Sequence, residues 1–187
     1  MEVEAYGGVD DGASHARFGP TRRNAPMFAP PGTSYVYVVY CMYHCLNVVT
    51  EPAGLPAAVL IRAVDPLEGV SRMREARQRW RLARHHAAPL ARRNPRLDLP
   101  DNGLARGPGL VCIAFDVDRS DDGRDLCEPD ASLRIEPRPE GTRDPEVVAT
   151  PRIGVDYADL SSRSRPWRLF DARSAAVSGR RRRIEGA

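Results

Sequence analysis

The sequence predicts a single domain with both α and β structure, and three observations support this fold class. The chain of 187 residues is long enough to bury one core without disulfide bonds or metal ions. Residues 35–40 alternate in side-chain type with the period of two that is typical of a β-strand. Residues 65–84 begin with a helix start signal and continue with apolar residues at helical spacing. We therefore expect residues 1–178 to form one domain, followed by a basic, disordered tail at residues 179–187.

Short apolar or alternating runs bounded by turn-forming residues predict the strands of a sheet. These runs are residues 2–6, 35–40, 47–50, 57–64, 132–136, 147–155 and 166–170. A Gly- and Pro-rich loop over residues 7–33 follows the first run, and a tight turn near Cys41 and Met42 would make a hairpin. Residues 85–109 predict a long surface loop, whereas residues 110–115 fit a short helix or a buried strand equally well.

The strongest helix signal follows the fourth apolar run. Asp65 fits an N-cap, Pro66 the first helical position, and Glu68 the acidic position three residues after the cap. The helix would continue to about residue 84 and bury one apolar stripe. This stripe consists of Val70, Met73, Ala76, Trp80 and Ala83.

The composition limits the compartment and the chemistry. The formal net charge of +3 does not by itself indicate nucleic-acid binding, and no apolar run is long enough to span a membrane. Four cysteines do not make a disulfide framework in a chain of this length, and the N-terminus does not resemble a signal peptide, so we expect a reducing cytoplasm. All 28 basic residues are arginine, so no lysine side chain can form a Schiff base.

A metal site is not predicted. Cys41, His44 and Cys45 resemble a ligand cluster, but on a strand His44 would face away from the two cysteines, and no second ligand pair has zinc spacing. Residues 118–123 resemble the start of a calcium loop, but Pro129 occupies its twelfth position. We interpret this segment as a solvated turn.

An aromatic strand gives the first indication of a binding site. Residues 35–47 contain four of the six tyrosines, and strand alternation places Tyr35 and Tyr37 on one face. Such a face can stack on flat rings, and nucleic-acid bases are the commonest flat partners. A well-packed sheet core is the alternative interpretation of the same pattern.

A carboxylate upstream adds a chemical component to this site. Glu4 stands between apolar residues, and Tyr6 lies on the same strand face. Beside Arg62, Glu4 would stay ionised and could hold a water molecule between the two side chains. With His15 nearby, these residues outline a pocket that binds a flat base and activates water against its sugar.

The same residues belong to motifs that occur in one order along nearly the whole chain. These motifs are Glu4-Ala-Tyr6 with His15; Thr21-x-Arg23-Asn24 with Met27-Phe28; Pro31-Gly32-Thr33-x-Tyr35-Val-Tyr37-x-x-Tyr40-x-Met42-Tyr43 through Asn47; Leu60-Ile-Arg62-Ala63 with Pro66-Leu67-Glu68-Gly69; Gly107-Pro108; and Arg152-Ile-Gly-Val155 with Pro166-Trp-Arg168. The chain resembles the alkyladenine (3-methyladenine) DNA glycosylases, the vertebrate and bacterial group of base-excision enzymes.

The resemblance implies an α+β fold, with a curved, mainly antiparallel β-sheet, a protruding β-hairpin and surrounding helices. It implies a DNA repair enzyme that flips an alkylated or deaminated purine out of double-stranded DNA and hydrolyses its N-glycosidic bond. With no lysine nucleophile, the enzyme would leave an abasic site and make no strand cut. We expect a monomer that needs no metal or cofactor, binds no membrane, and works at the nucleoid in the bacterial cytoplasm.

The resemblance also implies a role for each matching residue. Glu4 falls on the general base, and Arg62 on the residue that helps to hold the water. The base-binding positions are Tyr6, His15, Tyr37 and Asn47, of which Asn47 would disfavour guanine by crowding its amino group. Tyr40 falls on the wedge that fills the space left by the flipped base. Arg23 and Tyr43 are weaker candidates for DNA contacts.

Three departures from the family pattern affect these expectations. Only three residues precede Glu4, where family members carry a further helix and strand, so an impaired, truncated relic that binds lesions is one alternative. Cys41 replaces the glycine after the wedge tyrosine, which would strain a turn that needs positive φ. Leu110 replaces a lysine after Gly107-Pro108. A general single-strand-binding module is a second alternative, but it leaves Glu4 and Arg62 unexplained.

Overall fold

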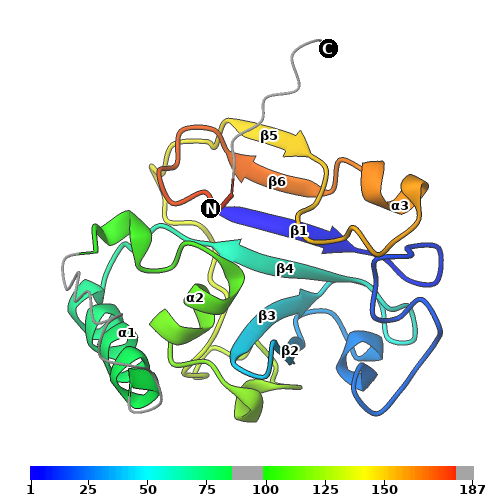
Figure 1. Ribbon diagram of the computed structural model, residues 1–187, viewed down its shortest axis with the longest axis horizontal. Coiled ribbons are helices and arrows are strands. Elements are labelled where there is room, and N and C mark those ends of the chain that lie inside the picture. Colours follow the sequence, from blue (N-terminus) through cyan, green and yellow to red (C-terminus); the bar gives the residue numbers. More distant parts are fainter. Residues whose placement is uncertain (86–98, 180–187) are drawn as a thin grey trace.

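The computed structural model describes residues 1–85 and 99–179 and has an α+β architecture (Figure 1). One antiparallel sheet runs in the order β2-β3-β4-β1-β6-β5. Its strands are β1 (Glu2–Tyr6), β2 (Ser34–Val39), β3 (Tyr43–Val49), β4 (Ala58–Ala63), β5 (Val147–Thr150) and β6 (Arg168–Asp171). The helices are α1 (Val70–His85), α2 (Pro108–Ala114) and α3 (Leu160–Ser164), with short 3-10 turns η1 (Ala25–Phe28), η3 (Asp101–Gly103) and η4 (Arg119–Asp121). The expected fold class is confirmed.

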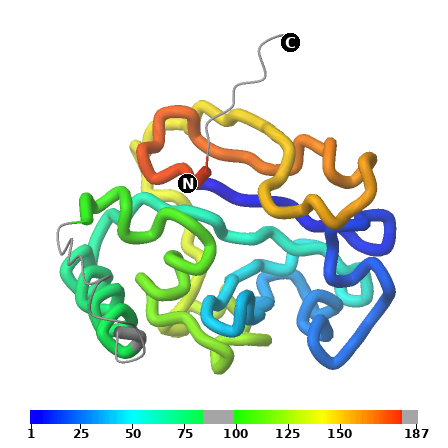
Figure 2. The backbone as a smooth tube through the Cα atoms, viewed as in Figure 1, coloured from blue at the N-terminus to red at the C-terminus, as the bar shows by residue number. Residues whose placement is uncertain are grey.

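Strand β1 is an inner strand of this sheet. It pairs with β4 on one side and with β6 on the other, and Glu4 lies opposite Leu60 and Arg168. Figure 2 shows the red C-terminal part of the chain beside the blue first strand. A strand from the middle of the sequence and a strand near its C-terminal end therefore flank the strand that carries Glu4.

Strands β2 and β3 form a hairpin, and the three residues Tyr40, Cys41 and Met42 connect them. Tyr40 and Cys41 both have φ of 52°, and the Met42 N–H donates a 3.1 Å hydrogen bond to the Val39 carbonyl. Positive φ at both central residues is the type I′ geometry that matches the twist of the strands. The turn therefore needs the conformation that Cys41 adopts only under strain. Cys41 lies in the turn and not on a strand, contrary to the assumption in the metal-site argument.

Helix α2 packs on β3 and β4, and helix α1 packs against α2 (Figure 1). Met73 of α1 packs with Val111 and Ala114 of α2 and with Leu104 and Ala105 between the helices. This cluster is one of the hydrophobic cores. It lies on the side of β3 and β4, so it supports the strands from which Asn47 and Arg62 project.

Two details of α1 differ from prediction. The helix begins at Val70, not at Pro66, because the Asp65 carboxylate accepts a 2.5 Å hydrogen bond from Ser174 Oγ, and Gly69 has a left-handed φ of 70°. Ala83 is exposed, whereas Arg77 is buried and donates to the Leu104 carbonyl. Tertiary contacts thus override the local start signal.

Other predicted elements are also revised. Residues 110–115 resolve as helix α2, which begins at Pro108 inside the predicted loop, with Gly107 as N-cap. Residues 132–136 form no strand, and β5 ends at Thr150 because Pro151 has no N–H to donate. Residues 86–98 of the predicted loop and 180–187 of the predicted tail lie outside the described residues. Within the described part of the chain, no helix is both long and apolar enough to cross a membrane.

Candidate active site

Glu4 is fully buried and accepts three hydrogen bonds. Its Oε2 accepts from the Tyr6 hydroxyl at 2.9 Å and from Arg62 Nη1 at 3.1 Å, and its Oε1 accepts from the Ile153 N–H at 2.7 Å. The structure therefore brings together the carboxylate, the tyrosine and the arginine that sequence analysis grouped. The arginine contacts Glu4 directly, where the sequence suggested a water between them.

A second carboxylate lies two residues earlier on the same strand face. Glu2 Oε1 accepts from Arg62 Nε at 2.9 Å and from Arg168 Nε at 2.6 Å, and Oε2 accepts from the Ser178 N–H at 2.5 Å. Burial alone would raise the pKa of Glu2, but the bonds from Arg168 and Ser178 outweigh it and lower the pKa. Glu2 and Glu4 thus balance Arg62 and Arg168 in a buried group of four charges. Sequence analysis missed Glu2, although the alternation Glu2, Glu4, Tyr6 was a usable signal.

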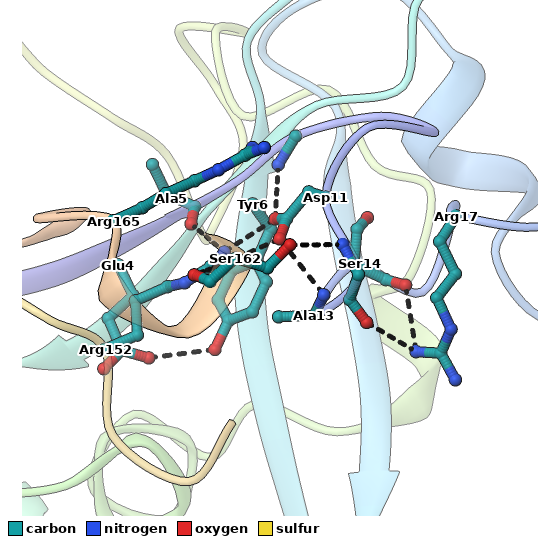
Figure 3. A network of polar contacts seen from close by, with 12 residues as sticks. Glu4, Ala5, Tyr6, Asp11, Ala13, Ser14, Arg17, Arg152, Ser162 and Arg165 are labelled. Carbon is teal, nitrogen blue, oxygen red and sulfur yellow. Dashed lines mark hydrogen bonds and ion pairs between the residues drawn. The ribbon is translucent and has the colours of Figure 1, made fainter. Parts of the chain in front are cut away.

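Arg152 holds Tyr6 from behind (Figure 3). Its guanidinium donates two bonds to the buried Asp11 carboxylate, at 2.6 and 2.7 Å, and one to the Ala5 carbonyl at 2.8 Å. The guanidinium carbon lies 4.7 Å from the centre of the Tyr6 ring and 5.1 Å from that of Trp167. Burial acts to raise the pKa of Asp11, but the bonds from Arg152 and two backbone amides lower it overall. This pair fixes the orientation of Tyr6, a role that sequence analysis missed.

A cavity of about 560 Å³ opens in front of this network. Its wall includes Tyr6, Arg62 and Ile153, the three residues that donate hydrogen bonds to Glu4. Glu4 itself lies directly behind that wall. A ring bound in the cavity would therefore stand next to the groups that hold the carboxylate.

The aromatic strand β2 contributes both to the hydrophobic core and to the wall of the cavity. Tyr35 is 1% exposed and belongs to a core cluster, Tyr37 packs against that cluster, and both residues line the cavity. The His15 ring meets the Tyr37 ring edge to face, with centroids 4.6 Å apart, and His15 Nδ1 lies 2.9 Å from the Tyr35 hydroxyl. Burial, together with the charges of Arg23 and Arg17, lowers the pKa of His15 to about 4. The imidazole in the cavity wall is therefore neutral at pH 7.

Asn47 also lines the cavity and is held rigidly. Its Nδ2 donates to the Tyr35 carbonyl at 2.9 Å and to the Cys45 carbonyl at 3.4 Å. Because the amide nitrogen is committed to the backbone, the orientation of the side chain is fixed. Asn47 is therefore a rigid polar position in a cavity with several aromatic side chains in its wall.

The remaining candidate residues lie around the cavity or away from it. Tyr40 is 83% exposed at the tip of the hairpin. Arg23 is exposed, with its guanidinium carbon 5.8 Å from the Tyr37 ring centre. Tyr43 is half-buried and stacks on Trp80 with centroids 5.2 Å apart, so it packs against α1. Of these three side chains, Tyr40 is the one that projects freely from a strand end.

Fold and site together fit one class of enzyme, a hydrolase that acts on a bond next to a bound flat ring. A buried carboxylate–arginine pair lies behind an aromatic cavity of the size that takes a flat ring, and an exposed aromatic residue stands at the tip of a neighbouring hairpin. Such a site can bind a ring and direct a water molecule at a bond next to it.

Comparison with known proteins gives the family. The methylpurine-DNA glycosylase family matches residues 1–175. A protein from Methanocella arvoryzae is 43% identical over 180 residues, which are 96% of this chain and 78% of that protein. A protein from Herpetosiphon aurantiacus is 42% identical over 186 residues, 100% of this chain and 75% of its own length. Both carry the name "Putative 3-methyladenine DNA glycosylase".

The chain belongs to the methylpurine-DNA glycosylase family. It is a DNA repair glycosylase, a hydrolase of N-glycosidic bonds. The alternative of a catalytically impaired relic receives no support from these relatives.

Proposed function

We propose that this enzyme flips damaged purines, alkylated or deaminated, out of double-stranded DNA and hydrolyses the bond between base and sugar. The observation that carries the proposal is the contact of Glu4 with Tyr6 and Arg62 at the wall of the aromatic cavity. The names of the relatives point to 3-methyladenine as one substrate.

The cavity walls suit a flat, cationic base. Alkylation at a ring nitrogen gives a purine a positive charge, and the faces of Tyr6 and Tyr37 attract such a ring by roughly 1–2 kcal/mol when water is excluded. His15 has its pKa lowered to about 4, so it adds no opposing charge at pH 7 and can form a hydrogen bond with the base. Asn47 would crowd the amino group of guanine, which would disfavour the undamaged base.

Glu4 would act as general base through Oε1. A carboxylate oxygen has room for about two hydrogen bonds, and Oε2 already accepts two, from Tyr6 and Arg62. Oε1 accepts one, from Ile153, which leaves one position for a water molecule. The water would attack C1′ of the sugar while the negative charge of Glu4 stabilises the oxocarbenium-like transition state. Arg62 forms an ion pair with Glu4 and would help to hold the water.

Extrusion of the base needs a group that fills its place in the duplex. Flipping costs a few kcal/mol of stacking, and an inserted side chain offsets part of this cost. Tyr40, at the exposed tip of the hairpin, would be this wedge, with Arg23 and Tyr43 as weaker DNA contacts. Because the chain has no lysine, the reaction would stop at the abasic site.

The proposal also covers the cellular compartment and the oligomeric state of the enzyme. The four cysteines are free, as is usual in a reducing compartment. We therefore place the enzyme in the bacterial cytoplasm, at the nucleoid when it is bound to DNA. It would act as a monomer.

Base release from a defined duplex tests the proposal. The substrate carries one hypoxanthine or 3-methyladenine, and wild type is compared with Glu4→Gln, which keeps the shape of the side chain but cannot take a proton. We expect strand breakage that appears only after alkali treatment, with wild type alone. Equal rates for the two proteins would exclude Glu4 as the base, and breakage without alkali would exclude a monofunctional enzyme.

A further inference from the structure

The mouth of the cavity contains a second charged side chain, Arg17, which the reaction described above does not use. Within the described part of the chain, Arg62 and Arg17 are the two arginines that line the cavity. Arg62 pairs with Glu2 and Glu4, whereas Arg17 has no carboxylate within salt-bridge distance among residues 1–85 and 99–179. Arg17 is thus an unneutralised cation at the entrance of a cavity that would receive a nucleotide.

The guanidinium of Arg17 is held in place before any ligand binds. Nη1 donates to the Gly12 carbonyl at 3.2 Å and to the Ser14 carbonyl at 3.4 Å (Figure 3). The guanidinium carbon also lies 4.7 Å from the centre of the Phe18 ring and 5.6 Å from that of Tyr157. These contacts reduce the conformational entropy that an arginine loses when it binds a ligand.

The two aromatic residues are unusual in their exposure. Phe18 is 86% exposed and Tyr157 is 61% exposed, and the Tyr157 hydroxyl donates a 2.8 Å bond to the Ala13 carbonyl. A large apolar ring at such exposure gains little from folding, so its contact with Arg17 is the interaction that the structure gives it. Arg17 and Tyr157 line the cavity and the Phe18 ring flanks the guanidinium, so the three side chains together form a positive rim.

Electrostatics then distinguish between possible ligands of this rim. A cationic alkylated purine would be repelled by an unneutralised Arg17, so the base does not account for its presence. Every nucleotide also brings phosphates, and a guanidinium binds phosphate oxygens with paired, charge-assisted hydrogen bonds. A phosphate at the mouth would neutralise Arg17 and remove its repulsion of the base.

We propose that Arg17, fixed between Phe18 and Tyr157, binds the phosphodiester next to the extruded nucleotide. This inference rests on the proposed function, because it needs a nucleotide in the cavity. The contact holds the DNA backbone against the rim while the base is inside, so it stabilises the flipped state and not the intact duplex.

The test removes the charge on each side of the contact separately. Dissociation constants are measured for wild type and Arg17→Gln on duplexes with a hypoxanthine nucleotide whose 2′-fluoro sugar resists hydrolysis. One duplex has normal phosphates, and two others carry a neutral methylphosphonate on the 5′ or the 3′ side of the lesion. On the normal duplex we expect Arg17→Gln to bind about tenfold more weakly, as for the loss of one charge-assisted hydrogen-bonded contact. The dependence of log Kd on log salt should fall by about 0.9.

Coupling between the two changes decides the proposal. On one methylphosphonate duplex the difference between wild type and Arg17→Gln should disappear, because the partner charge is already gone. An equal loss on all three duplexes, or no loss at all, overturns the proposal. Arg17→Lys, which keeps the charge and the fold of the loop, should retain coupling to the same phosphate. Arg173→Gln, two residues after the end of β6, serves as the matched control and should change neither affinity nor coupling.

The same data separate this proposal from the proposed function. A wild type that binds the hypoxanthine duplex no better than an undamaged duplex would overturn both. Clear lesion preference without coupling at either phosphate would overturn the role of Arg17 alone.

Discussion

Tyr6 and Glu4 stand two residues apart on one face of β1, and the Tyr6 hydroxyl donates a 2.9 Å hydrogen bond to Glu4 Oε2. Arg152 packs against the other side of the same ring. The tyrosine therefore has two functions in one side chain, because its ring lines the cavity and its hydroxyl fixes the carboxylate. A base that stacks on the Tyr6 ring would contact the same residue that orients the general base. Base binding and hydrolysis would then be coupled through Tyr6.

Removal of this hydroxyl should separate the two functions. In Tyr6→Phe the ring remains, so we expect lesion affinity to change less than twofold. Base release should slow by about tenfold or more, because a hydrogen bond to a charged group contributes about 1.5–3 kcal/mol. Single-turnover rates and dissociation constants on a hypoxanthine duplex measure the two effects. A loss of affinity with an unchanged rate would contradict this division of roles.

Local patterns in the sequence predicted two of the strands that carry the candidate site. Strand alternation placed Glu4 and Tyr6 on one face, and the tyrosine run predicted β2 and the turn after it. These features depend on neighbours along the chain, and a period of two is enough to reveal them. The resemblance to a known family added Asn47.

Long-range partners could not be predicted in the same way. Asp11 and Arg152 are 141 residues apart in sequence, and Glu2 and Arg168 are 166 residues apart. No local period connects such pairs; only the packing of β6 and the 151–154 segment against β1 brings them together. The predicted start of α1 was wrong for a related reason. The Asp65 carboxylate accepts a hydrogen bond from Ser174, which is distant in sequence, and does not cap the helix.

The buried pair of Asp11 and Arg152 should dominate the acid stability of this domain. Asp11→Asn leaves the Arg152 charge without its partner, and we expect a loss of about 3–5 kcal/mol in the free energy of unfolding at pH 7. The pKa of Asp11 is lowered from its usual 3.8, so its stabilisation is full above that value and is lost as pH falls through the lower folded value. The gap between wild type and Asp11→Asn should therefore narrow below about pH 4.

Denaturant unfolding at a series of pH values measures this gap. Asp156→Asn is the matched control, because the side chain of Asp156 is 92% exposed and its pair with Arg163 spans 3.5 Å. We expect that variant to differ from wild type by less than about 1 kcal/mol at every pH. A gap for Asp11→Asn that stays constant down to pH 2 would show that ionisation of Asp11 does not contribute.

The hairpin turn offers a stabilising substitution. Cys41 has φ of 52°, where a side chain costs about 1–2 kcal/mol and glycine costs little. Cys41→Gly should therefore raise the free energy of unfolding by about 0.5–1 kcal/mol after the entropy of glycine in the unfolded chain is subtracted. Cys41→Ala removes the thiol but keeps the Cβ, so it should give no gain. If both variants stabilise equally, the thiol and not the backbone is the cause.

Protonation of His15 should be visible in the stability of the protein. Burial and the charges of Arg23 and Arg17 lower its pKa from 6.5 to about 4. Between pH 6.5 and about pH 4, His15 binds a proton in the unfolded chain but not in the folded protein. The contribution of His15 to stability is therefore complete above about pH 6.5 and declines as pH falls toward 4. His15→Gln cannot be protonated, so the wild type should lose stability relative to this variant between pH 7 and pH 5.

Unfolding free energies at the two pH values measure the difference, and an NMR titration of the imidazole should give a midpoint of about 4. A midpoint near 6.5 would mean that the cavity holds a charged histidine at low pH, and the preference for cationic bases should then weaken on acidification.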